Sequence, residues 1–149
     1  MERYGVLVAR TLLAVIFIIS GFGKLADLSG TAAYIGSTGL PAPMLLALLA
    51  GVSELVGGVM VVVGFQTRLA AIGLALFLVP ATVLFHNPFG LEGAEAHMQQ
   101  IHALKNIAIA GGFLALAVHG AGAISLEAWL GRRVRPVEGA PTAPPVVSG

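Results

Sequence analysis

The sequence predicts an all-α integral membrane protein, a bundle of four transmembrane helices with a short interfacial helix between the first two spans. Composition is the first reason: 57% of the 149 residues are hydrophobic and 10% are charged, and the mean hydropathy is +0.93. Soluble domains carry about 25% charged residues, so this chain has too little polar surface to cover a water-soluble globule. The second reason is four apolar runs, each long enough to cross a ~30 Å hydrocarbon core at ~1.5 Å per residue.

The first span is predicted at Gly5–Phe22, which is interrupted only by Arg10. A cleaved signal peptide is the alternative for such a run, but the apolar core of a signal peptide has only ~7–15 residues. The next stretch, Ala26–Ala42, is too short and too polar to span a bilayer. We therefore expect a short interfacial helix there, with Ser29 or Thr31 as its N-cap.

The other three spans follow at short intervals. They are predicted at Met44–Phe65, at Leu69–Phe85 with Pro80 inside it, and at Ile101–Val118. The polar stretch His86–Gln100 between the last two is predicted to be a loop. Because Pro80 removes a backbone donor, we expect a kink in the third span.

The chain after the fourth span is predicted to stay outside the bilayer core. Ser125–Leu130 is typical of a short amphipathic turn capped by Ser125, with Trp129 suited to the membrane interface. Residues 136–149 are rich in proline and carry one charge, which favours a disordered cytoplasmic tail. Residues 1–135 would then form a single transmembrane domain.

Basic residues indicate how the bundle is oriented. Four spans place both termini on one side of the membrane, and most of the arginines fall on that side. They are Arg3, Arg68, Arg132, Arg133 and Arg135. Because cytoplasmic segments carry an excess of Lys and Arg, both termini are predicted to be cytoplasmic.

Glu54 is the one carboxylate of the second span and lies near its middle. The positions three and four residues away share its helix face, and all four hold small residues. They are Ala50, Gly51, Gly57 and Gly58. Small residues let helix backbones approach closely, so the neighbouring helices are expected to pack around this face.

Polar side chains on the other spans are expected to gather around Glu54. By depth in the proposed topology, Arg10 lies to its cytoplasmic side and Lys105 to its outer side, and both are long enough to reach it. Lys24 is placed to extend to the outer headgroups. The trail leading outward from Glu54 consists of Lys105, Asn106, His102, His86 and Ser20.

Two interpretations of this cluster remain open. Buried ion pairs often specify how helices pack, so the charges could only fix the bundle. Ionisable groups inside a membrane are also functional candidates, so the same residues could form a pocket that opens outward and binds a small head group or relays a proton.

Several kinds of site are disfavoured. His86 and His102 are interpreted as interfacial histidines. Haem ligation by these two residues is disfavoured because paired histidines are not evident elsewhere in the chain. A metal site formed by them with His97 is disfavoured because it lacks a carboxylate at ligand spacing. The chain has no cysteine, which excludes disulfides and thiol chemistry. A net charge of +1 does not provide the excess of basic residues that nucleic-acid binding requires. Common enzyme motifs are absent.

An ordered set of motifs over roughly residues 5–127 resembles the DoxX family. The set comprises Arg10, Ser20-Gly21-x-x-Lys24-Leu25, Gly39-Leu40-Pro41, Glu54-Leu55-x-Gly57-Gly58, Gly64-x-x-Thr67-Arg68, Phe85-His86, Leu104-Lys105-Asn106, Gly111-Gly112 and Ser125-Leu126. Glu127 stands where the family pattern has aspartate, which keeps the acidic character. The resemblance implies a small four-helix protein of the bacterial inner membrane, and membership of or association with a quinone-linked redox complex.

Three functions are therefore expected to compete. The first is a membrane redox component without independent catalysis, in which a quinone head group would bind near Glu54, Lys105, Asn106 and His86 while Glu54 or His86 exchanges protons. The second is a scaffold or assembly factor whose charges only hold the helices. The third is a small permeation protein for a solute or a proton, assembled as a homo-oligomer. The expected partners are the lipid bilayer and redox proteins, and fold-level likeness alone assigns no reaction.

Overall fold

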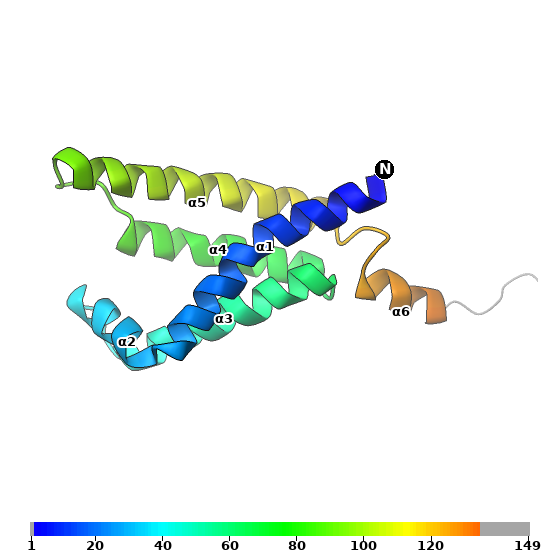
Figure 1. Ribbon diagram of the computed structural model, residues 1–149, viewed down its shortest axis with the longest axis horizontal. Helices are drawn as coiled ribbons and strands as arrows, with labels where there is room; N and C mark the ends of the chain where they lie inside the picture. The colour runs from blue at the N-terminus through cyan, green and yellow to red at the C-terminus, as the bar shows by residue number, and fades with distance from the viewer. Residues whose placement is uncertain (1, 135–149) are drawn as a thin grey trace, which may run out of the picture.

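The computed structural model describes residues 2–134 and consists of helices joined by short connections (Figure 1). The helices are α1 (Glu2–Ala26), α2 (Leu28–Ser37), α3 (Pro43–Val63), α4 (Thr67–Phe85), α5 (Gly93–His119) and α6 (Leu126–Val134). Four of them, α1, α3, α4 and α5, are long and apolar enough to cross a membrane. The predicted all-α membrane bundle is thus confirmed, with a short helix between the first two spans. The tail predicted at 136–149 lies outside the described residues.

The loop predicted at His86–Gln100 is wrong in its second half. α5 begins at Gly93, so the connection after α4 is short and the polar segment from Gly93 onward is helical. The reason is that this segment is rich in Ala, Glu, Met and Gln, which favour helix whatever their polarity. Glu95 in the first turn also faces the positive end of the helix dipole.

Helix α2 is capped by a residue that the sequence did not indicate. The Asp27 carboxylate accepts a hydrogen bond from the Gly30 backbone N–H at 2.9 Å, so Asp27 is the N-cap instead of Ser29 or Thr31. The Thr31 hydroxyl donates to the Asp27 carbonyl oxygen at 2.9 Å. α2 then packs on the first half of α3, where Ile35 is buried with Ala47.

Helices α1 and α3 form the most extensive contact in the bundle, and α1 crosses α3 in Figure 1. The approach is close because glycines face the partner helix. A Cβ atom at Gly51 would meet the Leu25 side chain at 2.8 Å, and one at Gly58 would meet Ile18 at 2.8 Å. The small residues beside Glu54 therefore admit a neighbouring helix, as predicted.

The tightly packed core fills the half of the bundle that lies toward the termini. There the rings of Phe17 on α1 and Phe113 on α5 meet edge to face, with centroids 5.2 Å apart. α5 otherwise packs chiefly along α4 and touches α1 only locally. The two helix pairs, α1 with α3 and α4 with α5, therefore have room between them in the half away from the termini.

Helix α6 is docked on the terminal end of the bundle through a buried arginine. Arg10 is 2% exposed, and its guanidinium donates to the carbonyl oxygens of Ala121 at 2.6 Å and Ile124 at 2.5 Å. The Glu127 carboxylate accepts from the Thr67 backbone N–H at 2.6 Å and so caps the start of α4. The arginine thus holds the α5–α6 connection to α1, and the glutamate holds α6 to the start of α4.

Gly64 ends α3 next to this arginine, and its replacement by alanine is expected to destabilise the fold by roughly 3 kcal/mol, the sum of a conformational cost and a steric clash. Its φ of 72° lies in the left-handed region, where an L side chain costs ~1–2 kcal/mol. A Cβ there would also press on Arg10 Nη1 and on the Ser125 Cβ at 2.5 Å. Unfolding in detergent measures the loss.

Gly39→Ala is the matched control for Gly64→Ala. Gly39 has a similar φ of 79°, but a Cβ there meets nothing within 4 Å. It should therefore carry only the conformational cost, about 1–2 kcal/mol. Equal losses of unfolding free energy at the two positions would mean that the placement of Arg10 does not require the absence of a side chain at Gly64.

Candidate functional site

A cavity of about 510 Å³ lies in the half of the bundle away from the termini. Residues of α1, α2, α3, α4 and α5 line it, together with Leu40 and His86 from the connections that follow α2 and α4. Its volume falls within the ~300–1,000 Å³ typical of small-molecule sites. Phe17 lines it at the packed core, so the cavity stops where the Phe17 and Phe113 rings meet.

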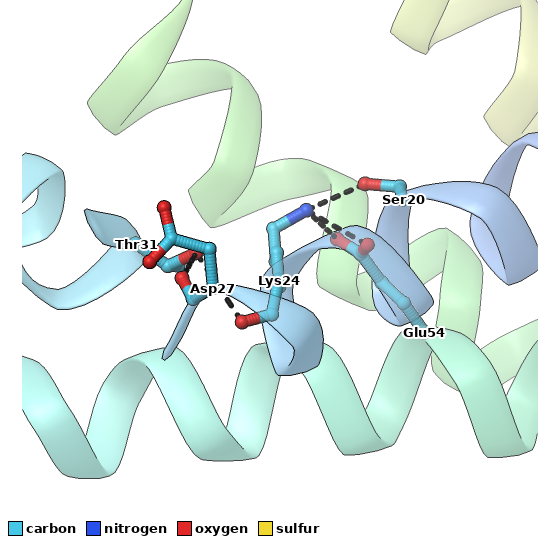
Figure 2. A network of polar contacts seen from close by, with 5 residues as sticks. All are labelled: Ser20, Lys24, Asp27, Thr31 and Glu54. Atoms are coloured by element: carbon cyan, nitrogen blue, oxygen red, sulfur yellow. Dashed lines mark hydrogen bonds and ion pairs between the residues drawn. The ribbon is translucent and has the colours of Figure 1, made fainter. Parts of the chain in front are cut away.

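An ion pair between α1 and α3 forms one wall of this cavity. Lys24 Nζ lies 2.8 Å from Glu54 Oε2 and 3.1 Å from Oε1, and it also donates to the Ser20 hydroxyl at 2.5 Å (Figure 2). The Glu54 side chain is 6% exposed and that of Lys24 is 28% exposed. The carboxylate is therefore buried, while the ammonium reaches it from a more open position.

The same wall continues onto α2 and α4 through a threonine and an aromatic pair. The Thr31 hydroxyl also approaches the Lys24 carbonyl oxygen at 3.4 Å, as Figure 2 shows. The rings of Tyr34 on α2 and Phe85 on α4 stack with centroids 5.5 Å apart. Thr31, Tyr34 and Phe85 line the cavity, as Lys24 does, so α2 covers it from one side.

The opposite wall comes from α5 and from the end of α4. Asn106 is buried and its side-chain amide donates to the Thr82 hydroxyl at 3.0 Å. Lys105 is exposed on the same helix, and its Nζ lies 3.1 Å from His102 Nδ1. Lys105 and Asn106 both line the cavity.

Two histidines lie close together beside Lys105. The rings of His86 and His102 have centroids 5.0 Å apart, and His86 Nδ1 lies 3.0 Å from Gln99 Oε1. His86 follows α4 directly and lines the cavity. His102 does not line the cavity, but it contacts Lys105 and His86, which do. Within residues 2–134 no group of three or more His, Asp or Glu side chains is placed to hold a metal ion.

The predicted contact of Arg10 with Glu54 is wrong. Arg10 bonds to carbonyl oxygens beyond the end of α5 and packs beside Gly64, ten residues from Glu54 along α3 and so about 15 Å away along the helix axis. Arg10 therefore belongs to the docking of α6 and does not line the cavity.

Lys24 takes the place that was assigned to Arg10. It does not extend to the headgroups as expected, because Glu54 and Ser20 hold its ammonium inside the bundle. Lys105 makes its described contact with His102 instead of Glu54, although both line the same cavity. A local signal was present only for the Lys24–Ser20 contact, since these two residues lie four apart on one helix face.

Some residues in or next to the cavity had no signal in the sequence. Thr82 holds Asn106, and Thr31 and Ser53 add hydroxyl groups to the lining. These short polar side chains occur within helices of ordinary appearance, so only the packing shows which of them meet. Of the predicted cluster, the structure brings Ser20, Lys24, Glu54, His86, Lys105 and Asn106 to one cavity.

The fold and the cavity define a multi-pass helical membrane protein with a mixed polar and apolar internal site. The profile of the DoxX family matches residues 5–87. The chain belongs to the DoxX family, and no solved structure matches it.

Named relatives agree with the membrane location. The inner membrane protein YphA of Escherichia coli is 40% identical over 121 residues, covering 81% of this chain and 86% of YphA. The inner membrane protein YqjF of the same organism is 38% identical over 133 residues, covering 89% of this chain and 97% of YqjF. CatD of Bacillus subtilis, whose name provisionally gives it as an oxidoreductase, is 36% identical over 115 residues, covering 75% of this chain and 84% of CatD.

Proposed function

We propose that this protein is the membrane subunit of a quinone-linked redox complex of the bacterial inner membrane, and that its cavity holds the quinone head group. The observation that carries the proposal is the cavity of about 510 Å³ with an ion pair in its wall. Two further points support it: the likeness to the provisionally named oxidoreductase CatD and the family resemblance.

The lining suits a molecule with a polar head and an apolar body. Most of the residues around the cavity are aliphatic or aromatic, and they would enclose the isoprenoid end of the ligand. Quinone carbonyl oxygens accept hydrogen bonds, and Lys24, Lys105 and Asn106 are the nearby donors. Glu54 and His86 would take up or release the protons that accompany quinone reduction.

A scaffold function is the second candidate, and the Lys24–Glu54 ion pair favours it. This pair joins α1 to α3, the two helices with the most extensive contact, so it could serve only to fix their arrangement. The permeation alternative is less favoured, because the Phe17–Phe113 contact and the surrounding core close the cavity toward the terminal end.

Orientation in the membrane is part of the same proposal. The described start of the chain and α6 lie toward the same end of the bundle in Figure 1. We place this end in the cytoplasm because most of the arginines fall there. The cavity would then open in the outer half of the bilayer.

A thermal-shift experiment separates the quinone site from the scaffold. A short-chain quinone added to the purified protein should raise its melting temperature, and Glu54→Gln should remove most of this rise because the Glu54 carboxylate positions the Lys24 ammonium that donates to the quinone. The matched control is Glu95→Gln, which changes an exposed carboxylate in the first turn of α5.

The outcomes of this experiment distinguish the two candidates. A melting temperature that no quinone shifts in the wild-type protein would contradict the proposed function. A Glu54→Gln protein that is less stable yet keeps the full quinone-induced rise would favour the scaffold.

A further inference from the structure

We propose that the cavity binds its ligand as an anion, a single negatively charged head group on an apolar body, with Lys105 as the counter-charge. The inference deepens the proposed function, because it concerns the same cavity and names the charge of what the cavity holds. It does not require that the ligand be a quinone.

The charges along the cavity wall leave one cation in excess. Lys24, Glu54 and Lys105 are the Lys, Arg, Asp and Glu side chains that line it. Lys24 and Glu54 neutralise one another across 2.8 Å. Lys105 therefore contributes a net positive charge to the lining.

No carboxylate on its own helix neutralises Lys105. Its described contact is His102 Nδ1 at 3.1 Å, a ring nitrogen that carries no negative charge. Glu95, the acidic residue in the first turn of α5, lies ten residues away and thus about 15 Å along the helix. Among the described residues, the ion pair within hydrogen-bonding distance is that of Lys24 with Glu54, and Lys105 takes part in none.

Lys105 is exposed at the cavity wall, and an uncompensated cation on a membrane-spanning helix favours an anionic partner. A charge in a medium of low dielectric constant is costly unless it is paired. Low-dielectric walls also concentrate the field of the charge in the cavity. An anionic head group beside Lys105 would relieve that cost, whereas a neutral head group would relieve less and a cationic one would add to it.

The rest of the lining sets the shape of the ligand. Leu46, Leu49, Phe77, Leu84 and Ile109 provide an apolar enclosure next to the charged groups. An ionised head with a hydrocarbon tail fits this arrangement. Both a long-chain carboxylate and an ionised hydroxyquinone have this chemistry, and the experiment below tells them apart.

The test compares head groups of different charge on the same tail. Dodecanoate, dodecanol and dodecyltrimethylammonium are titrated at micromolar concentration into the protein held in nanodiscs of zwitterionic lipid, and binding is followed by calorimetry. Dodecanoate should bind at least tenfold more tightly than the other two. Lys105→Gln should remove this preference and Lys105→Arg should keep it.

A control cation and a second pair of probes complete the design. Arg68→Gln alters an arginine beside Gly120, outside the cavity lining, and should leave the preference unchanged. An alkylated 2-hydroxy-1,4-naphthoquinone, ionised at neutral pH, is compared with its 2-methoxy ether. Tighter binding of the ionised quinone than of dodecanoate identifies the ionised quinone head as the preferred ligand, and the reverse identifies the carboxylate.

Failure of this inference differs from failure of the proposed function. Equal binding of the three dodecyl probes, or an unchanged preference in Lys105→Gln, would overturn the anion site. If a neutral quinone still raised the melting temperature, the proposed function would survive that result. Conversely, strong dodecanoate binding with no response to any quinone would keep the anion site and remove the quinone.

Discussion

Replacing Lys24 with methionine is expected to lower the free energy of unfolding by about 3–5 kcal/mol, because it leaves a buried carboxylate without its partner. The Glu54 side chain is 6% exposed and both of its oxygens bond to Lys24 Nζ. Titration of the purified protein with SDS, followed by circular dichroism, measures the change.

The same ion pair predicts an asymmetry between its two members. Glu54→Gln should cost much less than Lys24→Met, since the Lys24 side chain is 28% exposed and its ammonium can turn toward water. The double variant Lys24→Met with Glu54→Gln should regain most of the loss. If Lys24→Met and Glu54→Gln lower the free energy of unfolding equally, and the two losses add in the double variant, then the cost of leaving Glu54 buried and unpaired does not determine the stability of this pair.

Gly21→Ala is expected to destabilise the bundle by roughly 2–3 kcal/mol, the cost of overpacking a close contact. A Cβ at Gly21 would lie 2.5 Å from the Leu55 backbone nitrogen and 2.7 Å from the Gly51 carbonyl oxygen. Because backbone atoms cannot rotate aside, α1 and α3 would have to separate. The separation would also pull Lys24 from Glu54, and unfolding in detergent measures the total effect.

Gly23 gives a control for this substitution two residues further along the same helix. A Cβ there meets nothing within 4 Å. Gly23→Ala should therefore be neutral or stabilise the helix by up to about 1 kcal/mol. Similar effects of the two alanines would show that α1 and α3 do not approach as closely as described.

The fold could be predicted from the sequence because long apolar runs have few alternatives in a bilayer. The helix ends were harder to predict: polar residues from Gly93 onward form the first turns of α5, since composition favours helix there even outside the apolar segment. The close packing at Glu54 followed from Gly51 and Gly58, whose lack of side chains is a local property.

The partners within the site were only partly predictable. Depth along a helix suggested Arg10 for Glu54, but depth does not specify which way a helix face turns. α1 crosses α3 so that Lys24 meets Glu54, while Arg10 meets the connection that leads to α6. That connection lies more than a hundred residues beyond Arg10 in the chain, and no local pattern joins the two.

A quinone held in the cavity beside the Lys24–Glu54 pair should stay with the protein through purification. The most direct measurement extracts lipids from protein purified out of its native membrane and counts quinone molecules per chain. The comparison includes Ala81→Phe, which fills the cavity, and Ala108→Phe, which adds the same ring at an exposed position of α5 outside it. We expect close to one quinone per chain in the wild type and in Ala108→Phe and almost none in Ala81→Phe, whereas the absence of quinone from the wild type, or equal amounts in all three proteins, would contradict the claim.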